Sequence, residues 1–182
     1  MRKPLAALVT LLMVFYPFAV LWALRYEKLL WISFVLIFAA VLRYLLQPNR
    51  LFLPLTALAL LCGGLSLLLQ NDYGLKFYPV LMNLGTCIIF AYTLYSPPSM
   101  IERFARLHQP DLPESGVQWT RKVTQVWCVF LLLNAIIALM TVLFFSTQIW
   151  AIYNGFISYL LMGALLLAEF ILRKRHQAKQ MR

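Results

Sequence analysis

The chain has 182 residues, of which 63% are hydrophobic and only 12% charged, about half the charged fraction of a soluble globular domain. Its apolar residues come in long uninterrupted runs, which excludes a soluble enzyme, a disordered chain and a secreted disulfide scaffold. The net charge of +10 does not indicate nucleic-acid binding, because the basic residues cluster at the ends of the apolar runs. We therefore expect an all-α, polytopic bundle of membrane helices.

Six apolar runs approach the length of about 20 residues that a helix needs to cross the hydrocarbon core of a bilayer. They cover residues 4–24, 29–46, 51–69, 77–95, 126–145 and 150–172. The first is longer than the apolar core of a signal peptide, which predicts a retained span. The second is the shortest and contains Arg43, so it is either a short span or a tilted or partly re-entrant segment. Residues 1–182 are expected to form one integral membrane domain.

The distribution of basic residues predicts the orientation. If the N-terminus is cytoplasmic and all six runs cross the bilayer, the 16 Lys and Arg residues fall on the cytoplasmic side, except for Arg25, Lys28 and Lys76. This asymmetry follows the positive-inside rule. An odd number of spans would place the basic tail, residues 173–182, on the opposite side. We therefore expect a multi-pass plasma-membrane protein with both termini in the cytoplasm.

The one long connection, residues 96–125, is cytoplasmic in this arrangement. Within it, Ser99 to Glu102 has the S-x-x-E form of a capping box. Apolar residues then fall on one helical face, which predicts a short helix in the headgroup plane, and the turn-rich residues 109–116 end it. The charged residues of the connection are the candidates for contact with a partner or with lipid headgroups: Glu102, Arg103, Arg106, Arg121 and Lys122.

Polar residues recur at helical spacing within the last three apolar runs and at their edges. They are Asn83, Thr86, Thr124, Asn134, Asn154, Ser158 and Glu169. One interpretation is a polar cleft between the last three helices that holds a lipid headgroup. The other is ordinary packing, in which side-chain hydrogen bonds across helix interfaces contribute about 0.6 kcal/mol each. We favour this second interpretation, because such polar stripes occur in most small helix bundles. Glu169 has the further interpretation of an i, i+4 ion pair with Arg173 at the membrane edge.

Several chemistries lack their usual residues. The two histidines, His108 and His176, have no HExxH motif or cysteine partner, so no metal site is expected. No GxSxG, Walker A or GxGxxG motif is present, and we therefore expect no catalytic residue and no cofactor. The enzymatic alternative is a lipid-modifying role with Glu169 or His108 as acid or base.

Four stretches carry a resemblance to a known group of proteins: residues 96–104 (SPPSMIERF), 110–113 (PDLP), 120–128 (TRKVTQVWC) and 150–159 (WAIYNGFISY). There the chain resembles a family of small uncharacterised bacterial inner-membrane proteins encoded among fatty-acid-synthase-like genes for aryl-polyene lipids. The resemblance implies a non-catalytic accessory to cell-envelope lipid biogenesis in the inner membrane. The partners it implies are the bilayer and lipid-synthesis enzymes or acyl carrier protein at the cytoplasmic face.

A looser similarity over most of the chain is to the intracellular septation protein A family. Residues 71–79 and 145–150 resemble segments that precede two of its spans. The chain departs from that family in the charged connection 102–122 with its PDLP motif. Two alternatives to the accessory role stay open. The polar cleft would suit a lipid carrier or export subunit, and the looser similarity implies a septation-like envelope or division factor.

Overall fold

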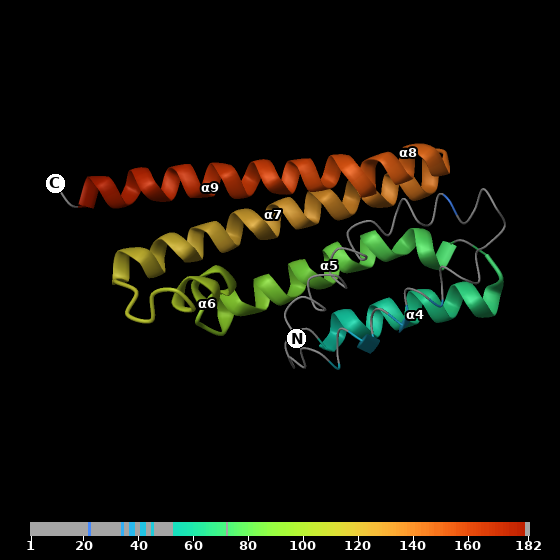
Figure 1. Cartoon of the computed structure of the whole chain (residues 1–182), viewed down its shortest axis with the longest axis horizontal. Helices are drawn as coiled ribbons and strands as arrows, with labels where there is room; N and C mark the ends of the chain where they lie inside the picture. The colour runs from blue at the N-terminus through green and yellow to red at the C-terminus, as the bar shows by residue number, and fades with distance from the viewer. Residues whose placement is uncertain are drawn as a thin grey trace.

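The computed structural model describes residues 53–71 and 73–180, with side chains up to residue 174, and isolated positions at 22, 34, 37, 38, 41, 42 and 45. Within this part of the chain every regular element is helical, as the apolar runs predict (Figure 1). The elements are α4 (Leu53–Leu69), α5 (Tyr73–Tyr95), α6 (Met100–Arg106), α7 (Glu114–Phe144), α8 (Thr147–Ile152), the π-helical turn η2 (Tyr153–Ile157) and α9 (Ser158–Gln180).

Within the described residues, three helical stretches have the length and composition to cross a membrane: Tyr73–Tyr95, Glu114–Phe144 and Thr147–Lys174. The described part of the chain thus shows three such helices, whereas six spans were predicted for the whole chain. The predicted span 51–69 is the shorter apolar helix α4, which has 17 residues. The predicted spans 4–24 and 29–46 lie, apart from isolated positions, outside the described residues. The chain has the character of a multi-pass membrane protein.

The helices form a layered bundle with α5 and α7 at its centre (Figure 1). Helix α4 packs along α5, and α6 lies at one end of the bundle against α7. Helix α9 returns beside α7 from the hairpin at α8, so the C-terminus lies at the same end as α6. The buried core joins α4, α5, α6 and α7 through Leu55, Ile89, Phe90, Met100, Trp127 and Leu131.

Large apolar side chains cover the outward faces of these helices. Leu68, Ile88, Leu133 and Leu160 are all more than half exposed. A soluble monomer rarely exposes contiguous apolar surface of this kind, whereas hydrocarbon accommodates it without cost. The outer faces therefore match a lipid environment.

Helix α7 begins earlier than the sequence pattern predicts. Residues 114–125 were assigned to a cytoplasmic connection, but they form the first turns of a helix of 31 residues that starts at Glu114. At 1.5 Å per residue this helix is about 46 Å long, against about 30 Å of hydrocarbon, so its polar start extends beyond the apolar run. Glu114 in the first turn favours this start, because a carboxylate interacts well with the positive end of the helix dipole.

The junction of α4 and α5 requires a residue without a side chain. A Cβ atom at Gly74 would lie 2.5 Å from the backbone oxygen of Cys62. This close approach lets the Ser66 hydroxyl accept the Leu75 N–H at 3.0 Å, in the first turn of α5. Amide groups at a helix start have no partner within their own helix, so α4 supplies one.

The last span is one helical stretch interrupted by a π-turn. Ser146 caps α8 by accepting the Ile149 N–H at 3.4 Å, and η2 follows at Tyr153–Ile157. The wider turn leaves backbone carbonyls without their usual i+4 donor. The Asn154 side chain adds a contact at this turn: its Nδ2 donates at 2.9 Å to the Trp150 carbonyl oxygen, which also accepts the Tyr153 N–H.

Candidate functional site

The polar residues at the centre of the bundle bind to one another. Asn134 Nδ2 in α7 donates to Asn83 Oδ1 in α5 at 3.0 Å, and Asn134 Oδ1 accepts the Tyr153 hydroxyl of η2 at 2.8 Å. Asn83 Nδ2 in turn donates to the Pro79 carbonyl oxygen at 2.8 Å. This chain of side chains connects three helical elements inside the apolar bundle.

A second polar contact joins α7 and η2 further along α7. Asn154 Nδ2 donates to Thr141 Oγ1 at 3.1 Å, and both residues are buried. Thr86 donates instead to the Met82 carbonyl of its own helix at 2.7 Å. Ser158 is buried at the start of α9. The contact between Asn154 and Thr141, like that between Asn134 and Asn83, has the form of interhelical packing.

Threonines of α5 and α7 hold the start of α6. The Met100 N–H donates to Thr93 Oγ1 at 2.9 Å, and the Ile101 N–H donates to Thr124 Oγ1 at 3.3 Å. Thr124 was predicted to line the polar cleft, but the structure places it at this junction. Thr93, which helical spacing places on the same face as Asn83 and Thr86, supplies the shorter of the two contacts. Phe104, in the second turn of α6, is about half exposed.

Glu102 is buried, although the sequence pattern placed it on the partner-facing surface. It forms a capping box with Ser99, whose N–H it accepts at 3.3 Å. Arg106 approaches the same carboxylate at 2.8 Å, and the Glu102 side chain is only 7% exposed. Arg106 also donates to the Pro110 carbonyl oxygen at 2.8 Å. This pair therefore fastens α6 to the turn that follows it.

The other three charged candidates have different surroundings. Arg103 donates to the carbonyl oxygens of Pro98 and Ser96, at 2.8 and 3.4 Å, so it ties α6 to the end of α5. Arg121 and Lys122 are exposed on α7. Of the five residues predicted to face a partner, these two have their charged groups free of hydrogen bonds and ion pairs with the part of the chain that the structure describes.

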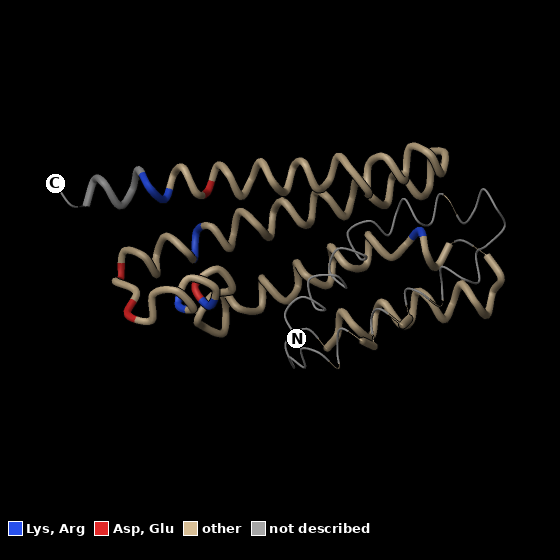
Figure 2. The backbone as a smooth tube through the Cα atoms, in the orientation of Figure 1, with Lys and Arg blue, Asp and Glu red and all other residues tan. Residues whose placement is uncertain are grey.

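The charged residues gather at one end of the bundle (Figure 2). Arg121 and Lys122 lie there, as do α6 and the end of the apolar stretch of α9 with Arg173 and Lys174. Lys76, at the start of α5, is the single charged residue at the opposite end among the residues drawn in colour. The positive-inside rule predicts that this charged end faces the cytoplasm.

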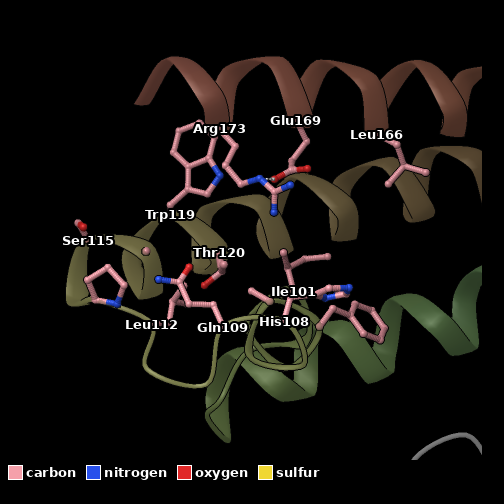
Figure 3. A pocket seen from close by; sticks show the side chains of 14 residues that line it. Ile101, His108, Gln109, Leu112, Ser115, Trp119, Thr120, Leu166, Glu169 and Arg173 are labelled. Carbon is pink, nitrogen blue, oxygen red and sulfur yellow. Dashed lines mark ion pairs between the residues drawn. The ribbon is translucent and has the colours of Figure 1, made fainter. Parts of the chain in front are cut away.

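A cavity of about 540 Å³ opens at the charged end, between α6, the connection after it, the start of α7 and α9. Figure 3 shows Glu169 and Arg173 reaching from α9 toward His108 and Gln109 on the opposite side. Most of the wall is apolar, and the lining residues are Ile101, Phe104, Ala105, His108, Gln109, Leu112, Pro113, Ser115, Gly116, Trp119, Thr120, Leu166, Glu169 and Arg173.

Glu169 is the only one of the seven polar candidates that lines this cavity. It is separated from Asn154 by about 22 Å of helix, at 1.5 Å per residue. The structure therefore does not bring the seven residues into one cleft. Glu169 forms the expected pair with Arg173, with the Arg173 Nε atom 3.7 Å from the Glu169 Oε1 atom. That distance is an ion pair without a hydrogen bond.

The described residues form neither a metal site nor a disulfide. No group of three His, Cys, Asp or Glu side chains that could hold a metal ion occurs there. The three cysteines are unpaired thiols within the helices, and Cys87 donates to the Cys128 carbonyl oxygen at 3.3 Å. His176 lies beyond the described side chains, and His108 lines the cavity.

No protein-family model, curated protein or solved structure matches the chain. The resemblances given above therefore stay predictions.

Proposed function

We propose that this protein is a non-catalytic accessory to cell-envelope lipid biogenesis in a bacterial inner membrane. In this proposal the charged end of the bundle faces the cytoplasm, and lipid-synthesis enzymes or acyl carrier protein bind there. The observation that supports it is the pair Arg121 and Lys122, which is exposed on the extended start of α7. The amides of Asn83, Asn134 and Asn154, by contrast, form hydrogen bonds inside the bundle.

The proposed contact is electrostatic. Exposed basic residues attract an acidic patch on a soluble partner and raise its rate of encounter. The extended start of α7 holds them beyond the apolar run, because the helix is longer than the hydrocarbon is thick. Arg103 and Arg106 contribute indirectly in this proposal, since their hydrogen bonds hold α6 and its connection in place.

Co-purification from membranes tests the proposal. The wild-type chain and the double variant Arg121→Gln, Lys122→Gln are purified under the same mild detergent conditions, and bound soluble proteins are identified by mass spectrometry. We expect lipid-synthesis enzymes or acyl carrier protein with the wild type and their loss from the double variant. Lys76→Gln, at the opposite end, is the control for a lost positive charge. Equal recovery of these partners with both chains, or none with either, would overturn the proposal.

A further inference from the structure

The cavity at the charged end joins two chemical environments in one space. Leu166, Trp119 and Phe104 supply apolar surface, whereas Glu169, Arg173 and His108 supply charge and hydrogen-bonding groups. Its volume of about 540 Å³ is within the range of small-molecule binding sites. An occupant must therefore carry an apolar part and a polar part side by side.

The position of the cavity indicates where the occupant comes from. The apolar stretch of α9 ends at Lys174, so Arg173 marks the level of the bilayer surface and Leu166 lies two turns deeper. The end of α5 and the start of α6 lie at the same end of the bundle. A lipid in the adjacent leaflet has its headgroup at the first level and its acyl chain at the second.

The ion pair between Glu169 and Arg173 indicates which charges a headgroup in this cavity should carry. Glu169 and Arg173 are 3.7 Å apart, and their side chains are 18% and 43% exposed. Neither makes a hydrogen bond to another side chain or backbone group in the described part of the chain, so the guanidinium donors and carboxylate oxygens remain available. A cation and an anion at this spacing complement a headgroup that itself carries both charges. An arginine side chain is well suited to bind a phosphate group. A carboxylate is well suited to bind an ammonium group.

We propose that this cavity binds one zwitterionic phospholipid of the adjacent leaflet. Its phosphate lies at Arg173 and His108, its ammonium group at Glu169, and one acyl chain along Phe104 and Leu166. The inference goes beyond recruitment, because a lipid can occupy the cavity whether or not a soluble protein binds Arg121 and Lys122. Phosphatidylethanolamine is the probe that has all three features.

Native mass spectrometry of the full chain, titrated with phosphatidylethanolamine or phosphatidylglycerol in detergent, tests the proposal. We expect one phosphatidylethanolamine to be retained by the wild type and about tenfold weaker retention by Arg173→Gln, the effect of losing roughly one charge-assisted hydrogen bond. Lys174→Gln is the matched control, because it removes the same charge one residue away and Lys174 does not line the cavity. It should retain the lipid as the wild type does.

Two further variants keep the outcome decisive. Ala105→Phe fills the cavity without changing a charge and should reduce the retention of both lipids. Glu169→Gln is nearly isosteric and should reverse the preference toward phosphatidylglycerol, because Arg173 then faces no carboxylate. Retention that Ala105→Phe leaves unchanged in a monodisperse helical sample, or a preference that Glu169→Gln does not alter, would overturn the proposal. Loss of lipid with intact recruitment of soluble proteins would leave the proposed function standing.

Discussion

Asn83 and Asn134 lie 51 residues apart in the sequence and share a hydrogen bond of 3.0 Å between α5 and α7. Asn134 also accepts a hydrogen bond from the hydroxyl of Tyr153 at 2.8 Å, so its amide connects α7 both to α5 and to η2. Hydrocarbon offers no water to replace these partners. The amide therefore fixes how α5, α7 and η2 align along their length, which apolar packing alone specifies weakly.

Replacement of Asn134 by Leu should destabilise the bundle. The substitution removes two hydrogen bonds and leaves Asn83 Oδ1 and the Tyr153 hydroxyl without this partner. Interhelical hydrogen bonds in membranes contribute about 0.6 kcal/mol on average and about 1.7 at most, so we expect a loss of about 1–2 kcal/mol in the free energy of unfolding. Denaturation in mixed micelles measures it. Tyr153→Phe breaks one of the two bonds and should cost about half as much; equal stability of all three chains would contradict the assignment.

Gly74→Ala should disrupt the junction of α4 and α5. The new Cβ atom would lie 2.5 Å from a backbone oxygen, which cannot move as a side chain can, so one helix must shift. We expect a cost of about 1–3 kcal/mol, the usual range for overpacking. Gly64→Ala is the matched control on α4, because no atom lies within 4 Å of its Cβ position. That variant should be neutral or slightly stabilising, and thermal unfolding in detergent separates the two. A stable Gly74→Ala protein would show that the helices are further apart.

Arg106→Gln should loosen α6. The substitution leaves the buried carboxylate of Glu102 without its cation and removes the donor to Pro110, and hydrogen bonds to charged groups contribute about 1.5–3 kcal/mol. Faster amide hydrogen exchange over residues 99–107, with exchange in α5 and α7 unchanged, is the expected result. Arg121→Gln, an exposed position on α7, should leave exchange as in the wild type. Unchanged protection in both variants would mean that the pair does not hold α6.

Cysteine labelling tests the orientation. In a background with Cys62, Cys87 and Cys128 replaced by Ala, Tyr73→Cys and Glu114→Cys place single thiols at exposed positions on opposite ends of the bundle. A membrane-impermeant maleimide should label Tyr73→Cys in intact cells and Glu114→Cys only after permeabilisation. The reverse pattern would place the charged end outside the cytoplasm.

Local signals in the sequence were sufficient for the short helix. The S-x-x-E pattern predicted α6 with its capping box at Ser99 and Glu102, because this contact involves residues three positions apart. The Glu169–Arg173 pair was predicted for the same reason, since it spans one helical turn. Predictions that depend on one helix alone were therefore the most accurate.

Features that depend on contacts between helices were not predictable from spacing. The polar stripes suggested a shared face, but not that Asn134 would pair with Asn83 while Thr124 would hold α6. The start of α7 was missed because residues 114–125 are polar and fall outside an apolar run. The cavity depends on how α9 lies over the connection after α6, which no local pattern records.

The most direct test of the central claim is a mass-spectrometric lipid profile of the cell envelope. It compares a host strain that lacks this protein with the same strain complemented by the wild type or by the Arg121→Gln, Lys122→Gln double variant. The account predicts that an aryl or acyl lipid is missing or stalled inside the cell without the protein, and that the wild type restores it while the double variant does not. An unchanged lipid profile in the strain that lacks the protein would contradict a role in lipid biogenesis, and altered cell shape or division in that strain would favour the septation-like alternative.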